Sequence, residues 1–245
     1  MKILALETST AKGGAAIIVD GQALAEETTD RQRSHSELLH VFVRNVLEKT
    51  QLRLEEIDAI AVGQGPGSFT GLRVAGNAGK TFASAYNKPL VAVDTLTQIA
   101  VQVRERSRPV LVMLNAFKNM VYLGLFDLSG AEPKYLKGPL AVPLKDIESV
   151  IGIISCTVAG DGWPLVPHFV PEHVRALWVR EDAPQDLPTP SVLGVIAHRW
   201  LAQGRVFDWR AFTPLYLRGS EAEENARGRL FNAVDAKDSK HGKNN

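Results

Sequence analysis

The chain has 245 residues, 45% of them hydrophobic and 22% charged, and its formal net charge is +1. This composition is that of an ordinary soluble globular protein, and the near-neutral charge excludes a wide basic surface for nucleic acid while allowing local patches. The single cysteine, Cys156, excludes an internal disulfide, and no apolar run approaches the ~18 residues of a membrane helix, so we expect a cytoplasmic protein without a membrane partner.

The first half of the chain alternates short apolar strands with two helices. Apolar runs that end in turn formers predict strands over residues 2–6, 13–21, 22–29, 54–63 and 88–95. Apolar residues at the helical period predict helices over residues 34–50 and 70–86. Ser34 and Glu37 have the spacing of a capping box at the start of the first helix.

The second half repeats the opening pattern. Residues 108–130 follow the order of residues 2–21: an apolar strand, a polar turn, an apolar strand and a turn with Asp and Gly. A strand over 151–162 and a helix over 190–204 follow. The repetition predicts an α/β protein of two related subdomains with a cleft between them. We assign residues 1–105 to an N-terminal subdomain, 106–218 to a C-terminal subdomain and 219–245 to a polar tail that is disordered in isolation.

The stretch GQGPGSFTG, residues 63–71, is rich in glycine and joins a predicted strand to a predicted helix. It is not a Walker A loop, because Val74 stands where that motif needs glycine, and Thr70 breaks the dinucleotide fingerprint. Pro66 also excludes a nucleophile elbow around Ser68. Two interpretations stay open: free amides at a helix start that accept an anion, or a tight connection that needs unusual backbone angles. The spacing alone favours the tight connection.

The helix after this loop contains Gly76 and Gly79 in its interior. Each costs about 1 kcal/mol relative to alanine, so close packing against another element should compensate. The 34–50 helix has an apolar face wider than one sheet contact requires. We therefore expect the two helices to lie side by side at the surface and to form a protein interface.

The residue types needed for catalysis do not assemble from the sequence. His35 and His40 lie five residues apart, about 140° around a helix, so they cannot hold one metal ion from one face. His168 and His173 repeat this spacing, and neither HExxH nor CxxC occurs. Glu7 follows an apolar strand, but one carboxylate is weak support for acid–base chemistry. We predict no catalytic and no metal-binding residue.

Four stretches of the sequence resemble the bacterial TsaB (YeaZ) family: ILALETST, VGQGPGSFTGLRVAGNAGKTFA, PLVAVDTL and the later PLYLR. The resemblance covers most of residues 1–100 and is most specific in GPGSFTGLR. It implies an actin/Hsp70-like ATPase (ASKHA) fold with mixed sheets and flanking helices. It also implies a part in threonylcarbamoylation of the adenosine next to the anticodon in tRNAs that read codons beginning with A.

In this family the protein is a non-catalytic scaffold that pairs with the catalytic paralogue TsaD, and the ATPase TsaE joins them. The resemblance implies that tRNA is reached only through this complex. Thr95 and Ile99 stand where the two metal-binding histidines of the paralogue would fall, and neither can replace an imidazole. Glu7 stands where many relatives have aspartate.

Two sets of residues follow as predictions. The residues that could face a nucleotide or anion are Glu7, Thr8, Gly65, Gly67, Ser68 and Thr70. The residues predicted to contact TsaD, or a second copy when TsaD is absent, are His35, Leu38, Leu39, Phe42, Val46, Leu72, Arg73, Val74, Gly76, Asn77 and Gly79. We expect no firmly bound cofactor, although ATP or ADP could lie at the partner interface.

Other functions remain as alternatives. A nucleotide-dependent transferase or hydrolase active on its own would use Glu7, Ser68, Thr70 or Asp94 in the cleft. A peptidase lacks a triad or zinc motif in the sequence. A direct tRNA-binding module would need more positive charge than the chain carries as a whole.

Overall fold

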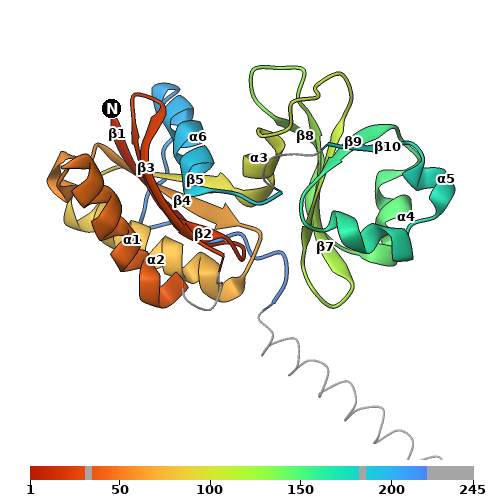
Figure 1. Cartoon of the computed structure of the whole chain (residues 1–245), viewed down its shortest axis with the longest axis horizontal. Coiled ribbons are helices and arrows are strands. Elements are labelled where there is room, and N and C mark those ends of the chain that lie inside the picture. The colour runs from red at the N-terminus through yellow and green to blue at the C-terminus, as the bar shows by residue number, and fades with distance from the viewer. Residues whose placement is uncertain (31–34, 182–185, 220–245) are drawn as a thin grey trace, which may run out of the picture.

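The computed structural model describes residues 1–30, 35–181 and 186–219, which form two five-stranded mixed sheets with flanking helices (Figure 1). The predicted tail, apart from Gly219, and the predicted Ser34 cap lie outside these residues. The first sheet consists of β1 (Lys2–Glu7), β2 (Gly13–Val19), β3 (Gln22–Thr29), β4 (Ala59–Gly65) and β5 (Leu90–Asp94). The second consists of β6 (Val110–Asn115), β7 (Met120–Asp127), β8 (Lys134–Pro143), β9 (Cys156–Ala159) and β10 (Trp178–Arg180).

The two sheets share one topology. The first has the order β3-β2-β1-β4-β5, with antiparallel pairing among its first three strands and parallel pairing of β1 with β4 and of β4 with β5. The second has the corresponding order β8-β7-β6-β9-β10 and the same pattern of directions. This duplication confirms the predicted actin/Hsp70-like ATPase fold with two related subdomains.

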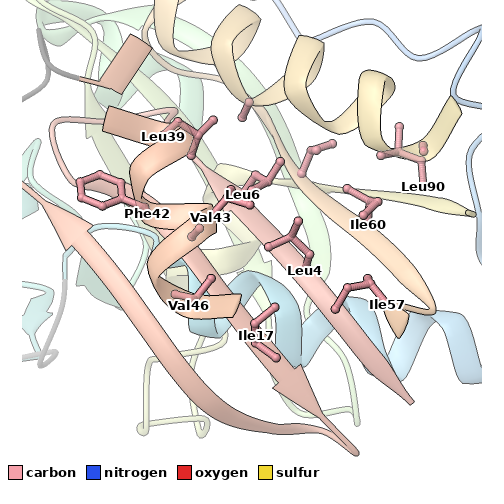
Figure 2. Close-up of a cluster of buried hydrophobic side chains, with 14 of the residues drawn as sticks. Leu4, Leu6, Ile17, Leu39, Phe42, Val43, Val46, Ile57, Ile60 and Leu90 are labelled. Carbon is pink, nitrogen blue, oxygen red and sulfur yellow. The ribbon is translucent and has the colours of Figure 1, made fainter. Parts of the chain in front are cut away.

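Alternation along the strands gives the first sheet two buried faces. On β1, Leu4 and Leu6 face the helices α1 (His35–Thr50) and α2 (Phe69–Ala85), and Figure 2 shows both side chains to the right of α1. Ile3 and Ala5 alternate with them and face α6 (Pro190–Ala202) on the other side. The period of two in β1 therefore places helices on both faces of the sheet.

Short helices cover the second sheet. The strand residues Leu111 and Met113 pack with α4 (Ile147–Ile151), the 3₁₀ turn η4 (Trp163–His168) and α5 (Glu172–Arg175). Residues on the opposite face pack against α3 (Thr95–Ala100), which directly follows β5 of the first sheet. Two further 3₁₀ turns are η2 (Leu54–Glu56) and η3 (Leu144–Asp146). None of the helices in the described part of the chain is long and apolar enough to span a bilayer.

The chain returns to the first subdomain after the second sheet is complete. Leu193, Ile196 and Ala197 of α6 pack on the first sheet, so the expected C-terminal subdomain of residues 106–218 does not match the packing. Sequence order suggested that assignment, but the apolar face of α6 is complementary to the free face of the first sheet. Beyond α6, the backbone amide of Leu215 donates to the carbonyl of Gln64, and this segment lies against α2.

Candidate functional site

The glycine loop between β4 and α2 is occupied by the chain itself. The amide of Ser68 donates to the carbonyl oxygen of Ser9 at 2.7 Å, and the Ser68 hydroxyl accepts from the amide of Gly71 as an N-cap. The hydroxyl of Thr8 donates to the carbonyl of Gly71 at 2.6 Å and accepts from the amide of Ala75 at 3.2 Å. The element that approaches the glycines is therefore the turn between β1 and β2.

The glycines are required by this close approach. A Cβ atom on Gly67 would collide with the carbonyl oxygen of Ser9, and one on Gly71 would collide with that of Thr8. Gly65 has a φ of +101°, a left-handed angle that favours glycine, and is packed against Leu72. Of the two interpretations left open by the sequence, the tight connection is the one observed.

Glu7 lies beneath this turn and is fully buried. Its carboxylate accepts hydrogen bonds of 2.7 Å from the amide of Ser9 and from the Nε2 amide of Gln98. Gly63 provides the space, since a Cβ there would collide with the Glu7 carboxylate. Burial raises the pKa of Glu7, and its hydrogen bonds with Ser9 and Gln98 only partly offset this effect.

The chain itself uses two of the amides that a phosphate could bind in this loop. The amides of Ser68 and Gly71 already donate within the chain, and the buried Glu7 carboxyl would repel an anion when ionised. Of the residues predicted to face a nucleotide, Glu7, Thr8 and Gly65 are buried, Gly67 and Ser68 are half-buried, and Thr70 is exposed. The fold brings these six residues together, but they form a packed strand-to-helix connection and not an open anion site.

The helix glycines do not face α1. A Cβ on Gly76 would lie 3.0 Å from the ring of Phe212, and one on Gly79 would collide with Val62 of β4. The prediction that this stripe packs against the 34–50 helix is therefore wrong. The small residues instead let α2 approach its own sheet and the segment after α6.

Much of the predicted interface is also core. Leu39, Phe42 and Val46 of α1 are 4%, 8% and 0% exposed and share one core cluster with the sheet, and Figure 2 shows Val46 beside Ile17. The buried members of the predicted set are Leu39, Phe42, Val46, Leu72, Gly76 and Gly79. Their assignment to a partner surface is wrong, because an apolar helical face looks the same in sequence whether a sheet or another protein covers it.

A smaller surface remains on the outer side of α1 and α2. Arg73 and Asn77 of α2 are exposed, whereas Leu38 and Val74 are half-buried at the edge of the core. Ala78 is also half-buried there and was not predicted; its position four residues after Val74 is the signal that could have identified it. The side chain of His35 lies outside the described residues. We call Leu38, Arg73, Val74, Asn77 and Ala78 the outer helix surface.

A second set of polar side chains, besides the cluster around Glu7, lies between the two subdomains. The Tyr135 hydroxyl of β8 donates to Asp94 at the end of β5 at 2.6 Å, and Asp94 also caps α3 through the amide of Thr97. Both residues line a cavity of about 140 Å³ together with Trp200 and Arg205. Burial raises the pKa of Asp94, and burial together with the Asp94 charge raises the pKa of Tyr135. This pair joins the subdomains, and Thr97 lines the same cavity.

The positions corresponding to the paralogue's histidines are structural. Thr95 and Ile99 are both fully buried in α3. Within residues 1–30, 35–181 and 186–219, no three His, Cys, Asp or Glu side chains are grouped so that they could hold a metal ion.

Comparison with known proteins places the chain. Residues 22–149 match the model of a family described as TsaD, tRNA N6-adenosine threonylcarbamoyltransferase. The chain is 30% identical over 127 residues to the tRNA threonylcarbamoyladenosine biosynthesis protein TsaB of Bacillus subtilis, covering 52% of this chain and 56% of that protein. TsaB of Escherichia coli is 26% identical over 238 residues, covering 94% of this chain and 100% of that protein.

Among solved structures, an uncharacterized protein from Pseudomonas aeruginosa with similarity to peptidase YEAZ superposes with a TM-score of 0.76 at 30% identity, covering 89% of this chain and 99% of that one. The match to the Bacillus relative spans about half of that protein's length. The fold and the family match define an actin/Hsp70-like ATPase-fold protein related to TsaD. Within that group, the chain belongs to the TsaB/YeaZ family.

Proposed function

We propose that the chain is a non-catalytic scaffold in the biosynthesis of tRNA threonylcarbamoyladenosine. Family membership supports the pathway, since the related TsaB proteins carry that process in their names. The observation that supports the scaffold role is the loop in which the carbonyl of Ser9 accepts from the amide of Ser68 and the hydroxyl of Ser68 accepts from the amide of Gly71, so that two donors a phosphate could use are taken by the chain itself. A subunit without its own phosphate site contributes by holding a partner in place.

The partner is a TsaD-like catalytic paralogue, and the outer helix surface is its docking site. Leu38, Val74 and Ala78 provide apolar area at the edge of the core, while Arg73 and Asn77 are exposed beside them. In the absence of the paralogue, the same surface pairs two copies by two-fold symmetry. A TsaE-like ATPase joins the complex, and ATP or ADP is accommodated at the interface between subunits.

The experiment that tests the role is reconstitution with stepwise omission. This chain is mixed with TsaD, TsaE, ATP, the threonylcarbamoyl donor and unmodified tRNA, and each component is left out in turn. Modification should be lost without this chain, and the chain alone should neither modify tRNA nor turn over ATP. Equal modification in its absence overturns the proposal.

The docking site is tested with a matched pair of substitutions. Asn77→Arg places a long cation on the exposed side of α2, and Ala202→Arg places the same side chain on exposed α6, across the sheet. Asn77→Arg should abolish co-elution with TsaD in size-exclusion chromatography and leave far-UV circular dichroism unchanged, while Ala202→Arg co-elutes normally. Co-elution of both variants would place the docking site elsewhere.

A further inference from the structure

The turn that joins β6 to β7 has an unusual backbone. Phe117, Lys118 and Asn119 have successive φ angles of +58°, +50° and +57°. Residues other than glycine rarely adopt left-handed angles, and three in a row persist only where the surroundings fix them. Such strain marks a place where the shape of the backbone serves some purpose besides packing.

The surroundings hold this turn from both ends. The Asn115 side chain accepts from the amide of Phe117 at 2.9 Å, and the carbonyl of Asn119 accepts from the amide of Leu144 at 2.9 Å. The guanidinium of Arg218 donates to the carbonyls of Ala116 and Phe117. The result is a phenylalanine ring that is 65% exposed, so the turn displays an aromatic side chain to solvent at the expense of core packing.

The same C-terminal segment connects this turn to the start of α2. Tyr216, two residues before Arg218, packs on the ring of Phe69 with centroids 4.8 Å apart. Arg73 lies 4.3 Å above the Phe69 ring, and its Nε donates to the Tyr216 hydroxyl at 3.4 Å. Aromatic faces and guanidinium groups from both subdomains thus form one surface, which we call the Phe117 surface: Phe69, Arg73, Phe117, Lys118, Tyr216 and Arg218.

The charge of this surface differs from that of the whole chain. Residues 66–77, 114–120 and 214–218 contain Arg73, Lys118 and Arg218 but no aspartate or glutamate, although the net charge of the protein is only +1. Aromatic rings interspersed with cations are the features that bind single-stranded nucleic acid, because bases stack on the rings and phosphates pair with the cations. The carboxylate of Asp161 also lies at the base of the turn, where it accepts from the amide of Asn115 at 2.8 Å. The three cations outnumber this carboxylate, and that excess of positive charge favours a polyanion.

We propose that the Phe117 surface contacts unpaired nucleotides of the tRNA loop that is to be modified, with a base stacked on Phe117. This inference rests on the proposed function, which brings the chain to tRNA within a complex. The contact positions the RNA and takes no part in the chemistry. Arg73 lies where this surface meets the outer helix surface, so RNA held here would lie beside the docked catalytic subunit.

The test is binding of a fluorescently labelled anticodon stem-loop to the full chain in its complex with TsaD, by anisotropy at low salt, with a fully paired RNA hairpin of equal length as the second probe. Phe117→Ala should weaken binding of the stem-loop about tenfold, and Phe117→Trp should retain it. The matched control is Phe169→Ala, because Phe169 is an exposed phenylalanine outside this surface. Arg73→Ala should lower the slope of log affinity against log salt by about 0.7.

The outcomes separate this inference from the proposed function. Equal affinity of Phe117→Ala and the unmodified chain, equal loss in Phe169→Ala, or no binding of the loop probe overturns the RNA contact. Loss of co-elution with TsaD by Phe117→Ala, with RNA binding intact, would make this a protein surface and also overturns it. None of these results affects the requirement for the chain in reconstituted modification, which tests the scaffold role on its own.

Discussion

The carbonyl oxygen of Ser9 accepts a 2.7 Å hydrogen bond from the amide of Ser68, and this contact joins the first turn of the chain to the start of α2. It uses a backbone donor that in other glycine loops is available to an anion. The glycines around it are therefore best understood as the space that the Ser9 turn needs, and substitutions can test this directly.

Gly67→Ala should destabilise the fold, because the added methyl group would collide with the Ser9 carbonyl. We expect a loss of about 1–3 kcal/mol in the free energy of unfolding measured with urea. The matched control is Gly130→Ala, where the nearest atom to a new Cβ is 3.7 Å away, and its stability should change by less than about 0.5 kcal/mol. Equal stability of both variants would mean that the Ser9 turn does not pack on the loop.

Two adjacent leucines of α1 should behave differently. Leu39 is 4% exposed and belongs to the core, so Leu39→Ala should cost about 2–5 kcal/mol of unfolding free energy. Leu38 is half-buried at the edge of that core, and Leu38→Ala should cost about 1 kcal/mol or less. Chemical denaturation of the monomer measures the unfolding free energy of both variants. A larger loss for Leu38→Ala than for Leu39→Ala would contradict the assignment of Leu39 to the core.

Asp161 should make stability depend on pH. Burial, with a contribution from nearby Asp186, raises its pKa to about 6 from 3.8. Between about pH 4 and pH 6 the folded state keeps a proton that the unfolded state has lost, so this group lowers stability as the pH rises. Asp161→Asn should be about 1–3 kcal/mol more stable than the unmodified chain at pH 7.5, with the difference vanishing near pH 4.

The control for that titration has the opposite sign. The amide of Ser129 bonds to Asp127 and lowers its pKa, so Asp127 stabilises the fold above its unfolded pKa and loses this effect as the pH falls. Asp127→Asn should therefore give no gain at pH 7.5. Thermal unfolding from pH 4 to 8 measures both variants, and a gain at pH 7.5 in both would contradict the assignment to Asp161.

Tyr135→Phe removes the hydroxyl that donates to Asp94 between the subdomains. The loss should be about 1–3 kcal/mol of unfolding free energy, since the Asp94 carboxyl loses a donor at a buried site. Tyr86→Phe at the end of α2 is the control and should be near neutral. Hydrogen exchange should also accelerate at the Thr97 amide, which shares the Asp94 carboxylate. Unchanged stability would mean that this bond does not hold the subdomains.

Sequence patterns predicted helices and strands well where the residues within each element determine its conformation. The short apolar run of β1 and the helical period in α1 and α2 predicted those elements within a residue or two. β8 was missed because Gly138 and Pro139 interrupt its pattern, and this edge strand leaves Leu136 and Leu140 exposed. The duplicated sheet confirmed the fold that the repeated hairpins and the family resemblance predicted.

The site was harder to predict because its decisive contacts are non-local. The pairing of Ser9 with Ser68 joins residues 59 positions apart, and no local pattern specifies it. The partners of Gly76 and Gly79, Phe212 and Val62, come from the segment after α6 and from the sheet. A glycine stripe indicates that something lies close, and only the tertiary structure identifies it.

The return of α6 to the first sheet makes the second subdomain an insertion within the first. A truncated gene product ending at residue 105 would leave Ile3, Ala5 and Ile18 without their cover and would aggregate, although it contains every strand of that sheet. Ribosomal synthesis must therefore extend through α6 before the first sheet can be fully covered.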